Sequence, residues 1–226
     1  ELEDKIATAD KAYSSWKSSS FAERKKLLNK VASLMKKKKK ELAEMITIEM
    51  GKLIAQSEAE IDMCISVYEY YAENGEEFLK DKDVEVKDGK AFIRNAPIGI
   101  ILGVMPWNYP FNQVARMAAP NIMAGNVIAI KHASNVPQCA KAIEDLFIEA
   151  GAPEGVYTNL FLSSKKIAKM AEDSRIAGMS LTGSEGAGSS LAEAAGKNLK
   201  KSVLELGGSD AFIVLEDADL ENAVEN

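Results

Sequence analysis

Apolar residues recur at three- and four-residue steps through the first eighty positions of the chain. This spacing is typical of helices that bury one face. One such run covers residues 21–50 and is followed by Gly51, a residue type that commonly ends helices. A second run covers residues 53–79 and contains Cys64, which the pattern places in the core. We therefore expect this part of the chain to be helical.

The pattern changes after residue 80. Two short β-prone runs, 84–86 and 91–93, flank the segment Lys87-Asp88-Gly89-Lys90. An Asp-Gly pair between such runs predicts a β-hairpin. Pro97 closes this piece of the chain.

From residue 97 onward, apolar runs alternate with amphipathic runs. Strands are expected at 98–104, 126–130, 157–162, 175–180, 202–206 and 211–215. Helices are expected at 112–124, at 136–150, in a short segment that ends at 171, and from 185 to 195. This alternation predicts an α/β fold with a parallel sheet covered by helices on both faces. Because nucleotides bind such sheets at the carboxyl ends of the strands, the residues that follow each strand are candidates for chemistry.

Composition narrows the function. The net charge of −6 argues against nucleic acid or an anionic membrane as the main partner, since both select basic surfaces. No apolar stretch reaches the roughly 20 residues that span a bilayer. With two cysteines far apart and one histidine, no metal site is expected, and the low cysteine content fits a reducing cytoplasm.

The first candidate segment follows the strand at 98–104. Pro106 and Pro110 restrict the backbone of this turn, so the amide of Asn108 could be held where it donates a hydrogen bond to a developing oxyanion. The alternative is an Asx-type turn in which Trp107 is simply packed.

Two further segments follow strands. Lys131, at the end of its strand, could bind ribose hydroxyls or lie near a phosphate, or it could be an ordinary surface lysine. His132 is assigned no proton-transfer role. The glycine-rich segment 182–188 joins a strand to a helix and could bind phosphate at the helix N-terminus. Its alternative is an ordinary turn in which Ser184 caps the helix.

The fourth segment carries Glu205 between two leucines, Leu204 and Leu206, ahead of a Gly-Gly pair. Burial would raise the pKa of this carboxyl group and make it a useful general base near neutral pH. The alternative is a glutamate that points into solvent. The flanking leucines favour burial.

Together, in this order and spacing, the segments PWNYPF, IKHAS, LTGSEGAG and LELGG, followed by EDADLENAV, resemble the aldehyde dehydrogenase superfamily. The resemblance runs from about Phe21 to the end of the chain. It implies oxidation of an aldehyde to the carboxylic acid with NADP or NAD, through a thiohemiacetal on a cysteine. A small-molecule aldehyde is the implied substrate, and a homodimer or homotetramer is the implied assembly.

The resemblance also implies roles for single residues. Asn108 matches the asparagine that holds the oxyanion, and Glu205 matches the general base. The residues that match cofactor-binding positions are Pro106, Trp107, Asn108, Lys131, His132, Ala133, Ser134, Gly183, Ser184 and Leu206.

The implied organisation has four parts. Residues 1–81 form the N-terminal helices, and residues 82–96 form a hairpin arm through which subunits associate. Residues 97–206 form the Rossmann-like NAD(P)-binding sheet, and residues 207–226 begin a catalytic domain. A two-stranded arm is marginally stable alone, which favours pairing with another subunit.

Two departures from the family pattern are informative. His132 stands where the family commonly has proline. This histidine and the sequence of residues 204–220 together resemble the bacterial succinate-semialdehyde dehydrogenases. Ser134 stands where many NAD-preferring members have a glutamate that would repel a 2′-phosphate. We therefore expect NADP to be accepted. Arg116 is a candidate for binding a substrate carboxylate, with a helix-surface ion pair as the alternative.

Neither Cys64 nor Cys139 matches the family nucleophile, which lies in a later segment. We therefore expect residues 1–226 alone to be inactive. Two alternatives stay open: a naturally short, non-catalytic nucleotide-binding relative, and a relative that releases acyl-CoA. The base at Glu205 favours hydrolysis over acyl-CoA release.

Overall fold

A computed structural model describes residues 2–225 and begins with a set of helices. These are α1 (Leu2–Trp16), α2 (Phe21–Lys37), α3 (Lys39–Met50) and α4 (Ile54–Leu79). Ser20 and Glu23 form a capping box at the start of α2, and Gly51 ends α3 in the left-handed conformation that glycine adopts readily.

The helical run expected over residues 21–50 is interrupted at Lys38, which was not predicted. Lys38 has φ −100° and ψ 12°, and α3 begins directly after it. The break lies inside the lysine run 36–40, where the side chains contribute little to the core. Beyond it, α3 packs against α4 and α6 (Pro137–Glu149).

The sheet contains β3 (Ile100–Met105), β4 (Val127–His132), β5 (Tyr157–Asn159), β6 (Ile176–Thr182) and β7 (Lys201–Glu205). All neighbours are parallel, in the order β5-β4-β3-β6-β7. The helices between the strands are α5 (Asn112–Ala124), α6, α7 (Ile167–Glu172) and α8 (Glu185–Lys197). The predicted α/β fold with a parallel sheet and flanking helices is therefore confirmed.

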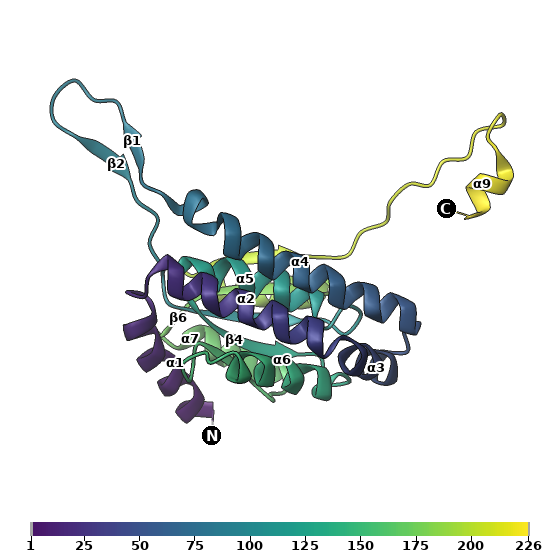
Figure 1. Cartoon of the computed structure of the whole chain (residues 1–226), viewed down its shortest axis with the longest axis horizontal. Helices are drawn as coiled ribbons and strands as arrows, with labels where there is room; N and C mark the ends of the chain where they lie inside the picture. The colour runs from purple at the N-terminus through teal and green to yellow at the C-terminus, as the bar shows by residue number, and fades with distance from the viewer. Residues whose placement is uncertain (1, 226) are drawn as a thin grey trace.

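The direction of the strand order reverses at β3. From β3 the chain moves to β4 and β5 through α5 and α6, and it then returns to the other side of β3 to form β6 and β7. Right-handed crossovers consequently place α5 and α6 on one face of the sheet and α7 and α8 on the other. Helices α2 and α4 pack over α5 as an outer layer (Figure 1).

The hairpin is present but has a wider turn than the Asp-Gly pair predicts. Strand β1 (Lys82–Val84) pairs with β2 (Ala91–Ile93), and the closing pair Val84–Ala91 leaves residues 85–90 as the loop. The expected first strand at 84–86 is thus two residues too late. A bidentate ion pair, from Nε and Nη2 of Arg94 to Oδ1 and Oδ2 of Asp81, ties the base of the arm. Figure 1 shows this arm projecting from the body of the molecule.

The strand expected at residues 211–215 is absent. Residues 206–215 form no helix or strand, and Figure 1 shows this segment leaving the body of the molecule. Phe212 and Ile213 are exposed there, because no neighbouring strand lies beside them within residues 2–225. The strand expected at 157–162 is also shorter than predicted and ends at Asn159.

Both cysteines lie in the core. Cys64 on α4 and Cys139 on α6 have no measurable exposure, which confirms the packing role expected for them. No helix within residues 2–225 is long and apolar enough to cross a membrane.

Candidate active site

The four candidate segments lie at one edge of the sheet. Met105 pairs with His132 at the ends of β3 and β4, and Thr182 pairs with Glu205 at the ends of β6 and β7. Parallel strands direct their carboxyl ends to the same edge, and the reversal between β3 and β6 opens a crevice there. The fold thus brings together residues separated by about a hundred positions.

The turn after β3 presents Asn108 to solvent. Trp107, Asn108 and Tyr109 are all exposed, and Trp107 is 49% accessible. The backbone below them is anchored, because the Ala133 N–H donates to the carbonyl of Met105 at 2.9 Å. The anchored turn leaves the Asn108 amide accessible, which is compatible with its donating a hydrogen bond to a bound molecule.

His132 supports this turn from below. Its ring is 5% exposed, and Nε2 lies 2.9 Å from the carbonyl oxygen of Pro110. Since that oxygen can only accept, Nε2 carries the proton and donates it. Burial lowers the pKa of His132, so the ring is neutral at pH 7 and no proton-transfer role is indicated.

Lys131 lies beside His132 with its ammonium partly buried. Burial lowers its pKa, and no carboxylate in the described part of the chain lies within ion-pairing distance of it. A partly buried cation without an anionic partner is unfavourable, so the position suits a polar or anionic ligand. Ser134 is exposed three residues later.

A small pocket of about 170 Å³ opens beside this segment. Its lining includes His132, Ala133, Ser134 and Asn159. Nδ1 of His132 and both side-chain polar atoms of Asn159 are buried without a protein partner. Most of the pocket lining is apolar, but a ligand or water could satisfy these polar atoms of His132 and Asn159.

The turn at residues 182–188 confirms the capping role of Ser184. Its hydroxyl accepts from the Ala187 N–H at 3.4 Å, at the start of α8. The turn also remains open to a ligand, because a Cβ built on Gly186 would meet no atom within 4 Å. At Gly188 a Cβ would come within 2.4 Å of Leu206, so this glycine permits Leu206 to pack on α8.

The burial expected for Glu205 is wrong. Its side chain is 54% exposed, because β7 is an edge strand that pairs, among residues 2–225, with β6 alone. The carboxylate lies 3.8 Å from the guanidinium of Arg116 on α5. The ion pair considered for Arg116 is therefore present, although exposed pairs of this kind contribute little to stability.

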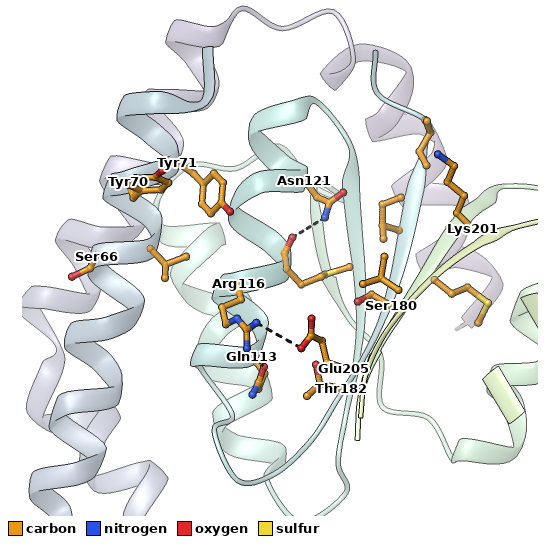
Figure 2. Close-up of a pocket in the computed structure, with 17 residues that line it drawn as sticks. Ser66, Tyr70, Tyr71, Gln113, Arg116, Asn121, Ser180, Thr182, Lys201 and Glu205 are labelled. Carbon is orange, nitrogen blue, oxygen red and sulfur yellow. Dashed lines mark hydrogen bonds and ion pairs between the residues drawn. The ribbon is translucent and has the colours of Figure 1, made fainter. Parts of the chain in front are cut away.

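Arg116 and Glu205 also line a cavity of about 750 Å³ between α4, α5 and strands β6 and β7. Figure 2 shows these two side chains with Gln113 and Thr182 at one end of it. The register places this polar end at the carboxyl ends of β6 and β7. The remaining lining is mostly apolar, as in pockets for small organic molecules.

The sheet edge consequently has two sides. The open turn of α8 lies on one face, whereas the cavity beside α5 lies on the other. Asn108 is in the turn between β3 and α5, next to the crevice where the two faces meet. Such an arrangement can hold a nucleotide on one side and a second small molecule on the other.

Sequence reasoning missed two residues at this site, Lys52 and Glu60. Both are buried, and they contact the turn that carries Asn108. The available signal was a lysine directly after the helix-ending Gly51 and a glutamate among apolar residues of the next helix. Neither feature of the sequence shows that these side chains contact a turn about fifty residues further along the chain.

Comparisons with known proteins agree with this geometry. The profile of the Aldehyde dehydrogenase family matches residues 1–226. A succinate-semialdehyde dehydrogenase [NADP(+)] of Deinococcus radiodurans is 48% identical over 97% of this chain and 46% of that protein. A probable succinate-semialdehyde dehydrogenase [NADP(+)] of Synechocystis is 48% identical over 99% of this chain and 49% of that protein.

Among solved structures, the succinic semialdehyde dehydrogenase of Streptococcus pyogenes in complex with NADP+ superposes with a TM-score of 0.94. It is 42% identical, and the match covers 99% of this chain and 50% of that one. The chain thus spans about half the length of the curated relatives it matches. With the whole chain matched by the family profile, the protein belongs to the aldehyde dehydrogenase family.

Proposed function

We propose that this chain is the cofactor-binding part of an NADP-dependent dehydrogenase that oxidises succinate semialdehyde to succinate. The observation that carries the proposal is the meeting of Asn108, Lys131, Ser184 and Glu205 at one edge of the parallel sheet. The names of the similar proteins from Deinococcus radiodurans and Synechocystis support the choice of aldehyde and cofactor.

The residues at this edge fit NADP. Lys131 offers an unpaired, partly buried ammonium for the adenosine ribose and its 2′-phosphate, and Ser134 adds an exposed hydroxyl. The open first turn of α8 suits the pyrophosphate, because helix N-termini favour anions. We assign Pro106, Trp107, His132, Ala133, Gly183 and Leu206 to the surrounding wall. The bound nucleotide would supply the hydride acceptor.

In the proposed reaction, a cysteine thiolate adds to the aldehyde carbon. Asn108 donates an amide hydrogen bond to the oxyanion that forms. Loss of the carbon-bound hydride to the nucleotide would convert the thiohemiacetal into a thioester, and Glu205 then removes a proton from the water that hydrolyses this thioester to the acid and the free thiol. The exposure of both side chains is compatible with these roles, since each must reach a substrate or a water molecule.

The nucleophile is proposed to lie outside residues 1–226. Cys64 and Cys139 are both buried, and burial raises the pKa of each thiol, so neither is present as a reactive thiolate. Residues 1–226 alone are consequently expected to be inactive.

Substrate choice is assigned to Arg116. Its guanidinium lies at the polar end of the cavity, where it could bind the carboxylate of succinate semialdehyde. The Arg116 side chain is 52% exposed and its contact with Glu205 is long. Replacing Glu205 by a substrate carboxylate as the partner of the guanidinium therefore costs little free energy.

We also propose that the enzyme is a homodimer or homotetramer joined through the arm of β1 and β2. Val84, Phe92 and Ile93 are exposed on this arm, which has only two strands. A second subunit would cover them.

The full-length protein tests the function. We expect oxidation of succinate semialdehyde with NADP, and a loss of kcat of about 100-fold or more in Asn108→Ala. Arg116→Met should raise KM for succinate semialdehyde while leaving KM for butanal, which lacks the carboxylate, nearly unchanged. Absence of aldehyde-dependent NADPH formation would support the non-catalytic alternative, and a strict requirement for coenzyme A would support acyl-CoA release.

A further inference from the structure

The start of α5 is capped by a residue from another helix. Phe111, at the N-cap position, makes no side-chain cap of its own. Instead, Oε1 of Glu60 on α4 accepts from the backbone N–H groups of Phe111 and Asn112 at 2.9 and 3.1 Å. These donors follow Asn108 by only three and four positions. The carboxylate therefore holds the carboxyl side of the turn that presents the Asn108 amide.

The other oxygen of Glu60 binds a lysine. Nζ of Lys52 lies 2.6 Å from Oε2, and the two side chains are 6% and 0% exposed. Lys52 belongs to the link between α3 and α4, directly after Gly51. The charged pair is thus almost completely removed from water, and it joins the outer helical layer to the active-site turn.

The ammonium of Lys52 also contacts the turn directly. Nζ lies 3.4 Å from the centre of the Tyr109 ring, within the range of a cation–π interaction. Tyr109 is the neighbour of Asn108. Lys52 therefore contacts a side chain of the turn, and Glu60 contacts its backbone.

Burial of such a pair is hard to explain by stability alone. Removing two charges from water costs several kcal/mol for each ion, and apolar pairs of similar volume are often as stable. A surface pair already ties α3 to α4: Lys39 on α3 binds Asp62 on α4 at 2.6 Å. What the buried pair adds is its set of directed contacts to the turn at residues 109–112.

We propose that Lys52 and Glu60 are positioning residues that hold the 106–111 turn so that the Asn108 amide is aimed at the reacting oxyanion. The inference rests on the proposed function. Neither side chain touches the substrate, and both act through Asn108. Preorganised donors are effective because they need not reorient during the reaction. A displacement of the turn by a few tenths of an ångström would therefore lower kcat.

The test uses the full-length enzyme with the variants Lys52→Met and Glu60→Gln. Methionine keeps much of the lysine volume without the charge, whereas glutamine keeps an oxygen that can accept from the backbone. Lys39→Met and Asp62→Asn are the matched controls, because they break an exposed lysine–carboxylate pair that also involves α4 but, among residues 2–225, makes no hydrogen bond or ion pair with the Asn108 turn. Urea unfolding of each variant separates loss of stability from loss of rate.

We expect kcat to fall about tenfold or more in Lys52→Met and Glu60→Gln, with KM for NADP within about threefold of wild type. The control variants should keep the wild-type kcat. In an Asn108→Ala background, Lys52→Met should cost no more than about threefold, because the donor that it positions is gone. Equal losses in both backgrounds, or an unchanged kcat, would overturn the inference.

Failure of the proposed function has a different signature. In that case the wild-type enzyme oxidises no aldehyde, or Asn108→Ala has no effect. Crystal structures of Lys52→Met and Lys39→Met then decide the positioning role without activity. The 106–111 turn should be displaced or poorly ordered only in Lys52→Met, and an unmoved turn would refute the inference.

Discussion

Replacing Ser134 by glutamate should shift the cofactor preference of the enzyme from NADP toward NAD. Ser134 is exposed just after β4, three residues after the unpaired Lys131, and it lines the small pocket there. If the 2′-phosphate of NADP binds at this position, a carboxylate would repel it. NAD has a hydroxyl group instead, which a carboxylate can accept from.

The size of the effect follows from electrostatics. A phosphate monoester carries a charge of about −1.7 near pH 7. At a separation of about 5 Å and an effective dielectric constant of about 60, a carboxylate raises the free energy of NADP binding by about 2 kcal/mol. That corresponds to a loss of about 25-fold in kcat/KM for NADP at low ionic strength. Added salt should reduce the loss, because the site is open to solvent.

Steady-state kinetics of the full-length enzyme with both cofactors measure this ratio. Ser134→Gln is the matched control, since glutamine has the size of glutamate without its charge. We expect it to lower kcat/KM for NADP far less than glutamate does. An equal effect of both replacements would show that size and not charge is responsible. An unchanged NADP-to-NAD ratio in Ser134→Glu would refute the placement of the 2′-phosphate beside Ser134.

Two further predictions concern the core. Arg24 is 5% exposed and donates to three main-chain carbonyls, so Arg24→Met should lower the free energy of unfolding by about 3 kcal/mol in urea titrations. A loss below about 1 kcal/mol would mean that water replaces these contacts. Cys64 and Cys139 should react with a thiol reagent at pH 8 only when the protein unfolds, because burial raises both thiol pKa values. Rapid labelling of the native protein at either position would contradict their burial.

Much of the fold was accessible from local sequence patterns. The helix predicted at residues 112–124 begins and ends where α5 does, because Gly125 follows with the left-handed conformation that ends it. The alternation of strands and helices predicted the parallel sheet, and parallel strands bring their carboxyl ends to one edge. For that reason the sequence predicts that the four segments containing Asn108, Lys131, Ser184 and Glu205 lie at the same edge.

The remaining features depend on partners distant in the chain. Glu205 resembles a buried residue because leucines flank it, yet its exposure depends on how many strands and helices cover β7. Residues 211–215 have strand-like composition, but a strand also needs a hydrogen-bonded neighbour, and none lies beside them in the described chain.

The support of the Asn108 turn shows the same division. Composition and spacing determined that a rigid, proline-bounded turn follows β3 and carries an amide. Only the packing of α4 against α5 brought Glu60 to the backbone of residues 111 and 112, and Lys52 to the ring of Tyr109. The physical reason is range. Backbone preferences and hydrophobic periodicity act over a few residues, whereas burial, ion pairing and capping between helices depend on which surfaces meet when the chain folds.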